Sequence, residues 1–105
     1  MDVFINKIKL KPGFSHQRYE TWVRERDYAT SPQFEGLARF FVSRARTDPE
    51  APFHYFEVIV MDSKEALEAA MQTEAFKGLL ADFGEMGEIV ESFAGAQLDP
   101  GFFRD

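Results

Sequence analysis

Alternating hydrophobic and polar positions along four segments of the chain predict four β-strands. The predicted strands cover residues 3–11, 37–46, 53–62 and 88–93. Other segments repeat their hydrophobic positions every three or four residues, which predicts amphipathic helices. The first predicted helix runs from about residue 16 to residue 28 or 29. Two more follow the third strand, with hydrophobic faces at residues 66–71 and 76–83.

Capping and turn residues bound these elements. Pro12-Gly13 predicts a turn after the first strand, and Ser15 is a suitable N-cap for the helix that follows. Asp62 and Thr73 are the expected N-caps of the two later helices. Gly84 is the expected end of the last helix.

The predicted order is strand, helix, two strands, a helical region and a last strand. This order is typical of an α+β, ferredoxin-like (βαββαβ) fold, in which an antiparallel sheet carries its helices on one face. A length of 105 residues fits one such domain, spanning residues 1–105.

The second and third predicted strands are hydrophobic on both faces, whereas a sheet with one solvent-exposed face should alternate. Phe40 and Val42 alternate with Phe41 on one strand, and Ile59 alternates with Val58 and Val60 on the next. Since helices cover only one face, something else must cover the other. We therefore expect a homodimer in which two sheets pack face to face into a barrel.

Composition narrows the range of functions. The net charge of −6 argues against a nucleic-acid partner. No apolar stretch approaches the roughly 20 residues of a membrane span, and no signal peptide is recognised, so a membrane partner is not expected. The chain has no cysteine, which fits a cytoplasmic location and excludes disulfides and cysteine-based zinc sites. Aromatic residues make up 15% of the chain, which suits a core, a partner surface or a pocket for a flat ligand.

The stretch from residue 19 to residue 28 contains the single tryptophan and two of the three tyrosines. On a helix Tyr19 and Asp27 lie on one face, with Trp22 and Arg26 beside them. A carboxylate near a helix C-terminus is disfavoured by about 0.3–1 kcal/mol through the helix dipole. An acid in an unfavourable position next to aromatic side chains predicts a site.

Two interpretations of Asp27 are open. In one, it pairs with Arg24 or Arg26, or hydrogen-bonds the turn at residues 30–31. In the other, its carboxylate lies at a pocket between helix and sheet, as a base or as an acceptor for an N–H or O–H group of a ligand. Tyr28 can add a hydroxyl there only if the helix ends between the two residues, because neighbouring side chains diverge by about 100°.

Glu57 is the second candidate, since it is the only acid or base in the hydrophobic run from residue 56 to residue 61. A buried glutamate needs a partner or a raised pKa. Arg39 on the neighbouring strand is the expected partner. Alternatively, Glu57 faces Asp27 across a cleft and forms a proton-transfer site with it.

Several other residues are weaker candidates. His54 is interpreted as a structural residue, with contact to a ligand as the alternative. Asn6 is interpreted as a contact to a ligand or as a hydrogen-bond partner of neighbouring residues. His16 and His54 have no metal-binding spacing, so no metal is expected. The hydrophobic helix positions Phe76, Leu79, Leu80 and Phe83 are interpreted as core rather than pocket.

No P-loop, G-x-G-x-x-G or G-x-S-x-G motif occurs, so neither a nucleotide, nicotinamide or flavin cofactor nor nucleophilic catalysis is expected. This leaves cofactor-free acid/base chemistry or plain binding.

Tyr19-Glu20-x-Trp22, followed by Arg24-Glu25-Arg26-Asp27-Tyr28, resembles the signature of the REDY-like HapK proteins, small ferredoxin-like domains from pigment biosynthesis. The resemblance extends to the strand that ends Leu10-Lys11-Pro12-Gly13 and to the strand from Tyr55 to Ile59. Arg26 interrupts a literal R-E-D-Y.

The resemblance implies a role in making prodigiosin, a red tripyrrole, and kinship with dimeric α+β barrel proteins that include cofactor-free oxygenases. It implies that Trp22, Asp27, Tyr28 and Glu57 form a pocket. Three functions follow as expectations. The first is binding of a flat pyrrolic intermediate, with Asp27 or Glu57 as hydrogen-bond acceptor or catalytic acid/base. The second is non-enzymatic assistance to other biosynthetic enzymes, and the third is cofactor-free monooxygenation.

Overall fold

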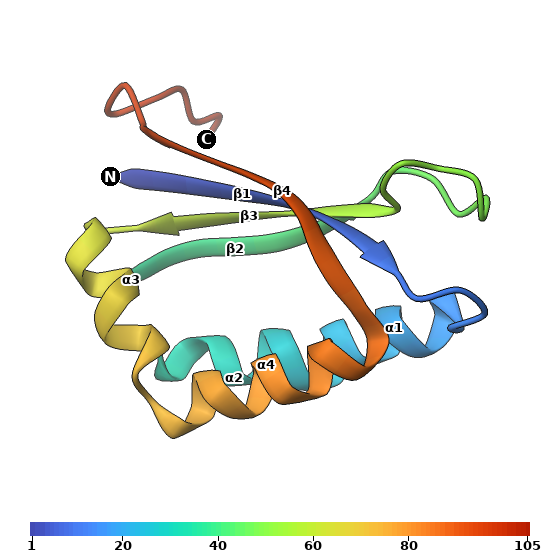
Figure 1. Cartoon of the computed structure of the whole chain (residues 1–105). Helices are drawn as coiled ribbons and strands as arrows, with labels where there is room; N and C mark the ends of the chain where they lie inside the picture. Colours follow the sequence, from blue (N-terminus) through green and yellow to red (C-terminus); the bar gives the residue numbers. More distant parts are fainter.

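The computed structural model describes all 105 residues and contains one four-stranded antiparallel sheet with the helices on one face (Figure 1). The strands are β1 (Asp2–Leu10), β2 (Leu37–Arg44), β3 (Tyr55–Met61) and β4 (Gly87–Ala96). Their order in the sheet is β2-β3-β1-β4. The predicted α+β, ferredoxin-like fold is confirmed.

The first predicted helix consists of consecutive pieces. They are α1 (His16–Trp22), a π-helical segment η1 (Val23–Asp27), the short α2 (Tyr28–Thr30) and a 3₁₀ turn η2 (Ser31–Gln33). After β3 come α3 (Lys64–Met71) and α4 (Glu74–Met86). The π-helical segment is not readable from the hydrophobic pattern. It widens the helix at the residues that carry Asp27.

Three expected helix boundaries can be compared with the structure. Ser15 caps α1, and its hydroxyl accepts the Arg18 N–H at 3.1 Å. Thr73 caps α4 in the same way. The expected cap at Asp62 is wrong, because the Ser63 hydroxyl accepts the Ala66 N–H and caps α3 instead.

The expected end of α4 at Gly84 is also wrong. The helix continues to Met86, and β4 begins directly at Gly87. A Cβ atom at Gly87 would lie 2.8 Å from the carbonyl oxygen of Lys9, so β1 comes too close to allow any side chain there. The chain therefore leaves the helix at the residue that permits this strand contact.

Strand register places three polar side chains side by side on the helix-facing side of the sheet. Asn6 in β1 pairs with Glu57 in β3 and with Ser92 in β4. Their neighbours on the same face of β1, at two-residue spacing, are Phe4 and Ile8. A polar row thus crosses an otherwise hydrophobic face.

The most buried part of the protein lies at one end of the layer between helices and sheet. It consists of Ile8, Leu10, Tyr19, Val23, Tyr55 and Met86. No helix covers the other face of the sheet (the uncovered face), on which Ile5, Phe41 and Val58 lie next to one another, and the segment that follows β4 runs on that side (Figure 1). None of the helices has the length and apolar character needed to cross a bilayer.

Gly87→Ala should lower the free energy of unfolding by about 1–3 kcal/mol, because the new methyl group overlaps the backbone of β1. Gly84→Ala is the matched control, since its Cβ meets nothing within 4 Å and the residue is helical. It should raise stability by about 0.5–1 kcal/mol. Urea unfolding of both variants tests this, and equal effects of the two substitutions would contradict it.

Candidate functional site

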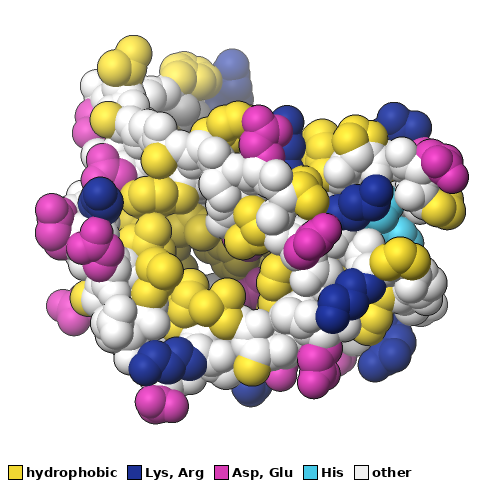
Figure 2. Space-filling view, viewed as in Figure 1, with side chains coloured by type: hydrophobic (Ala, Val, Ile, Leu, Met, Phe, Trp, Pro, Cys, Tyr) yellow, Lys and Arg dark blue, Asp and Glu magenta, His cyan; other side chains and the backbone are white.

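A cavity of about 350 Å³ lies between the helices and the sheet. It is lined by 20 residues, of which 16 are hydrophobic. Figure 2 shows a hollow bordered by hydrophobic side chains on the face viewed. The polar lining residues are Asn6, Asp27, Ser31 and Glu57, and the aromatic ones are Phe4, Tyr19, Trp22, Phe34, Phe40, Phe76 and Phe83.

Of the sequence-predicted site residues, Asn6, Tyr19, Trp22, Asp27 and Glu57 line this cavity together. They come from β1, from the continuous helix α1–η1 and from β3. Both candidate acids line the cavity, and the charge of Glu57 acts on Asp27.

The interpretation of Phe76, Leu79, Leu80 and Phe83 as core rather than pocket is only partly right, because all four line the cavity while Leu79 is also buried and Phe83 also packs against the buried cluster. Leu80 remains 48% exposed. Helical periodicity identifies the face that points toward the sheet, but it does not reveal whether the space in front of that face is filled.

Asp27 has no cationic partner. Arg24 lies 3.7 Å from Glu20, and Arg26 lies 3.3 Å from Asp82. The Ser31 hydroxyl donates to the backbone carbonyl of Asp27 and not to its side chain. The interpretation of Asp27 as an ordinary ion pair or turn residue is therefore wrong, and its carboxylate has no hydrogen bond.

Asp27 and Tyr28 point to different places, because neighbouring side chains on a helix diverge by about 100°. The wider turn of the π-helical segment is closed by the Tyr28 N–H, which donates to the carbonyl of Val23 five residues earlier. Asp27 faces the cavity, whereas the Tyr28 hydroxyl accepts the N–H of Val42 on the edge strand β2 at 2.9 Å. Tyr28 therefore lies outside the cavity and ties the helix to the sheet.

Glu57 is held by neutral groups. The Asn6 side-chain N–H donates to Glu57 Oε2 at 2.7 Å, and the Ser92 hydroxyl donates to Asn6 Oδ1 at 2.7 Å. The expected ion pair with Arg39 is wrong. Arg39 is paired in register with Val60, on the opposite face of β3, and lies over the Phe41 ring.

Both acids have raised pKa values. Burial, with a smaller contribution from the nearby charge of Glu57, raises the pKa of Asp27 from 3.8 to about 7. Burial also raises the pKa of Glu57, against the opposing effect of the Asn6 hydrogen bond. With a pKa of about 7, part of the Asp27 population carries a proton near neutral pH.

Trp22 is fixed on the cavity wall by a residue that sequence analysis missed. Its indole N–H donates to Asp82 of α4 at 3.1 Å, and this hydrogen bond lowers the pKa of Asp82. Arg26 binds the same carboxylate, is exposed and does not line the cavity. The signal available in the sequence was an acid next to Phe83 on the hydrophobic helix face.

His54 also lies outside the cavity and is structural. It is buried, and its Nδ1 accepts the N–H of Leu10 at 3.1 Å. The other ring nitrogen, Nε2, then carries the proton and donates to the carbonyl of Asp48 at 3.0 Å. Because both nitrogens are used, His54 has no free atom for a ligand.

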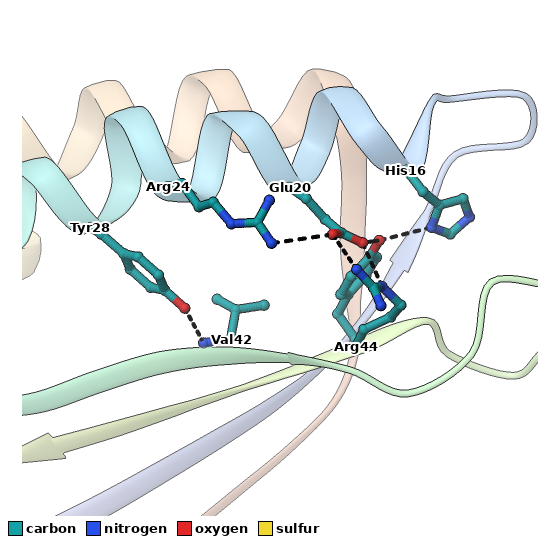
Figure 3. A network of polar contacts seen from close by, with 7 residues as sticks. His16, Glu20, Arg24, Tyr28, Val42 and Arg44 are labelled. Atoms are coloured by element: carbon teal, nitrogen blue, oxygen red, sulfur yellow. Dashed lines mark hydrogen bonds and ion pairs between the residues drawn. The ribbon is translucent and has the colours of Figure 1, made fainter.

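A second polar cluster, beside the cavity, surrounds Glu20 (Figure 3). Arg44 and the Tyr55 hydroxyl each donate to its carboxylate at 2.7 Å. His16 Nδ1 lies 3.0 Å from the Tyr55 hydroxyl. The hydrogen bond from Arg44 is the main reason that the pKa of Glu20 falls to about 2.

Four arginines between residues 24 and 46 form ion pairs on the surface. Arg24, Arg26, Arg44 and Arg46 each pair with an acid. No three His, Cys, Asp or Glu side chains gather in an arrangement that could hold a metal ion.

Comparison with solved structures gives close and distant relatives. The crystal structure of HapK from Hahella chejuensis is 40% identical, with a TM-score of 0.94 and coverage of 100% of each chain. SnoaB, a cofactor-independent oxygenase from Streptomyces nogalater, is 18% identical with a TM-score of 0.73, covering 95% of this chain and 97% of its own. A dimeric ferredoxin-like protein of unknown function from Thermobifida fusca is 12% identical, with a TM-score of 0.68 and coverage of 90% and 86%.

The two distant structures share the fold with this protein, and at such low identity they show nothing more. No match was found among curated protein sequences. A family model, REDY-like protein HapK, matches residues 2–98. Together with the 40% identity over the full length of a HapK structure, this match shows that the chain belongs to the REDY-like HapK family.

Proposed function

We propose that the protein binds a flat, N–H-bearing pyrrolic intermediate of a prodigiosin-type pathway in the cavity between helices and sheet. The observation that carries the proposal is Asp27, a carboxylate without a partner in a largely hydrophobic cavity. Keeping an unpaired acid there costs stability, and such groups are concentrated at functional sites. Membership in the HapK family supports a biosynthetic role in general.

The dimensions and lining of the cavity suit this class of ligand. A volume of about 350 Å³ lies at the small end of ligand pockets, which is enough for two or three five-membered rings. Trp22, Tyr19 and Phe83 offer aromatic faces for stacking. Asp27 and the free oxygen of Glu57 are acceptors for pyrrole N–H groups.

A second candidate function is cofactor-free acid/base chemistry in the same cavity. It is favoured by the pKa of about 7 for Asp27, because a general base works best when its pKa is near the working pH. SnoaB, which shares the fold, is described as a cofactor-independent oxygenase. In such a reaction Asp27 or Glu57 would remove a ring proton from the bound substrate before oxygen reacts.

We further propose that two copies associate through the uncovered face of the sheet. Ile5, Val58 and Phe41 form a hydrophobic row across three strands of that face, and Phe93 on β4 is 46% exposed. A hydrophobic sheet face of this kind is unusual on a monomer. Pairing of two copies would bury it and complete a barrel.

Titration with a bipyrrole aldehyde should quench Trp22 fluorescence, because Trp22 is the only tryptophan and lines the cavity. Asp27→Asn should weaken binding by about tenfold through loss of a charged acceptor. Glu25→Gln removes an exposed acid from the same helical segment and is the control that should bind normally. Absence of quenching up to about millimolar ligand, an affinity of only about −4 kcal/mol, would favour the non-enzymatic partner function instead.

The raised pKa of Asp27 predicts how stability depends on pH. A carboxyl group with a pKa of 3.8 when unfolded and about 7 when folded stabilises the fold below pH 4, and this stability is lost as the pH rises through 7. Asp27→Asn should therefore be more stable than the parent at about pH 8, by about 1–3 kcal/mol, with a smaller gain at about pH 5.

Denaturant unfolding at both pH values measures this difference. Glu20→Gln is the opposite-sign control, because the pKa of Glu20 is lowered by its hydrogen bond with Arg44 and its ionised form stabilises the fold. That variant should lose stability at about pH 8. A gain for Asp27→Asn that does not change with pH would show that Asp27 titrates normally.

Light scattering during size-exclusion chromatography should give twice the 12.1 kDa chain mass at micromolar concentration. Val58→Lys places a charge in the middle of the uncovered face and should produce monomers that remain folded. Glu25→Gln, on a helix, should leave the mass unchanged. A parent protein that elutes as a monomer would contradict the proposed association.

A further inference from the structure

The polar end of the cavity has acids but no cation. Asp27 and Glu57 reach it from η1 and β3, and none of the 20 lining residues is Lys, Arg or His. Arg24 and Arg26, which flank Asp27 in the sequence, bind Glu20 and Asp82 instead. Two partly buried carboxyl groups are thus left without the positive charge that such groups normally find.

The Tyr19 hydroxyl is a further hydrogen-bonding group of the cavity that has no partner within the protein. The Tyr19 side chain is only 1% exposed and lines the cavity, yet its hydroxyl makes no hydrogen bond within the protein. Tyr19, Asp27 and Glu57 line the same cavity, and burial followed by the charges of Glu57 and Asp27 raises the pKa of Tyr19. No side-chain polar atom of the protein is fully buried without a partner, so the Tyr19 hydroxyl is open to the cavity, where a bound molecule can supply its hydrogen bond.

The surroundings of the two acids also suit a positive charge. Glu57 accepts one hydrogen bond, from Asn6, and Asp27 accepts none, so most of their acceptor capacity is free. The rings of Tyr19 and Trp22 lie next to them with centroids 6.2 Å apart. Aromatic faces attract cations, most strongly where water is excluded.

We propose that this end of the cavity is a subsite for the positively charged nitrogen of a flat, otherwise hydrophobic ligand, with its N–H groups bridging Asp27 and Glu57 and Tyr19 completing the contact. The inference rests on the proposed function in one respect, which is that the cavity binds a ligand. It goes further by assigning the charge of that ligand.

Binding of a cation at this subsite should release a proton. The titratable groups facing the subsite are Asp27 from η1, Glu57 from β3 and Tyr19 from α1, whereas the lining residues of β1, β2, β4, α3 and α4 are uncharged. Burial keeps Tyr19 neutral by raising its pKa. A bound cation favours ionised carboxylates, so the proton that part of the Asp27 population carries near pH 7 should leave when the cation binds.

Two probes of the same shape test the subsite. 4-Aminoquinoline is a cation near neutral pH, and 1-naphthylamine is its neutral isostere with carbon in place of the ring nitrogen. Isothermal titration calorimetry with the full chain at about pH 7.5 should give about tenfold tighter binding of the cation. Repeating the titration in phosphate and in Tris, which differ in ionisation enthalpy, should reveal proton release for the cation only.

Asp27→Asn and Glu57→Gln should each reduce the preference for the cation and the proton release. Both substitutions keep side-chain shape and remove a costly acid, and circular dichroism verifies that the variants are folded. Glu25→Gln makes the same change in net charge on an exposed part of η1 and should keep the full preference. A preference that survives in both cavity variants would reflect general attraction to an acidic protein and would overturn the subsite.

Other outcomes separate the two proposals. Equal or tighter binding of the neutral probe would overturn the cation subsite while leaving the cavity as a ligand site. Failure of both probes and of the bipyrrole aldehyde to bind at about millimolar concentration would overturn the proposed function, and the subsite with it.

Discussion

The rest of the structure depends on the packing of Tyr19. This side chain joins α1 to β3 through the Tyr55 ring, at a centroid distance of 4.7 Å, and to α4 through Phe83, at 6.5 Å. It belongs both to the buried cluster at one end of the helix–sheet layer and to the wall of the cavity. Because one end is fixed this tightly, the other end can stay unfilled without loss of the fold.

Two acids on one continuous helix, Glu20 and Asp27, have opposite effects on the stability of the fold. Glu20 receives hydrogen bonds from Arg44 and Tyr55, and its pKa falls to about 2. Asp27, two turns later, receives none, and its pKa rises to about 7. The first acid stabilises the contact between helix and sheet, whereas the second costs stability at neutral pH. Selection for stability alone would replace an acid that destabilises the fold. Its presence therefore indicates a functional site.

Sequence analysis predicted the strands, their order and the helix face toward the sheet, because hydrophobic periodicity records these features directly. It also identified Asp27 and Glu57 as the acids to follow. It could not provide the π-helical segment at η1, which is not readable from the hydrophobic pattern. Nor could it find Asp82, whose role depends on the contact between α1 and α4.

The errors have physical reasons of the same kind. Arg39 was expected to pair with Glu57, but strand register places it opposite Val60, on the other face of the sheet. Phe76 and Phe83 were interpreted as core because a hydrophobic face looks the same whether it meets side chains or a cavity. Strand register, and whether side chains fill the space in front of a helix, depend on how the sheet and helices pack together. Neither can be predicted from the sequence of one strand or helix.

The central claim is that Asp27 is an unpaired, partly buried acid facing a ligand cavity, and its own titration is the most direct measurement. Carboxyl carbon-13 NMR, assigned with Asp27→Asn, follows the ionisation of this residue as pH is varied. The account predicts a midpoint at about 7, together with a raised midpoint for Glu57. A midpoint near the ordinary value of 3.8 would mean that solvent or a cation reaches the carboxylate, and would contradict it.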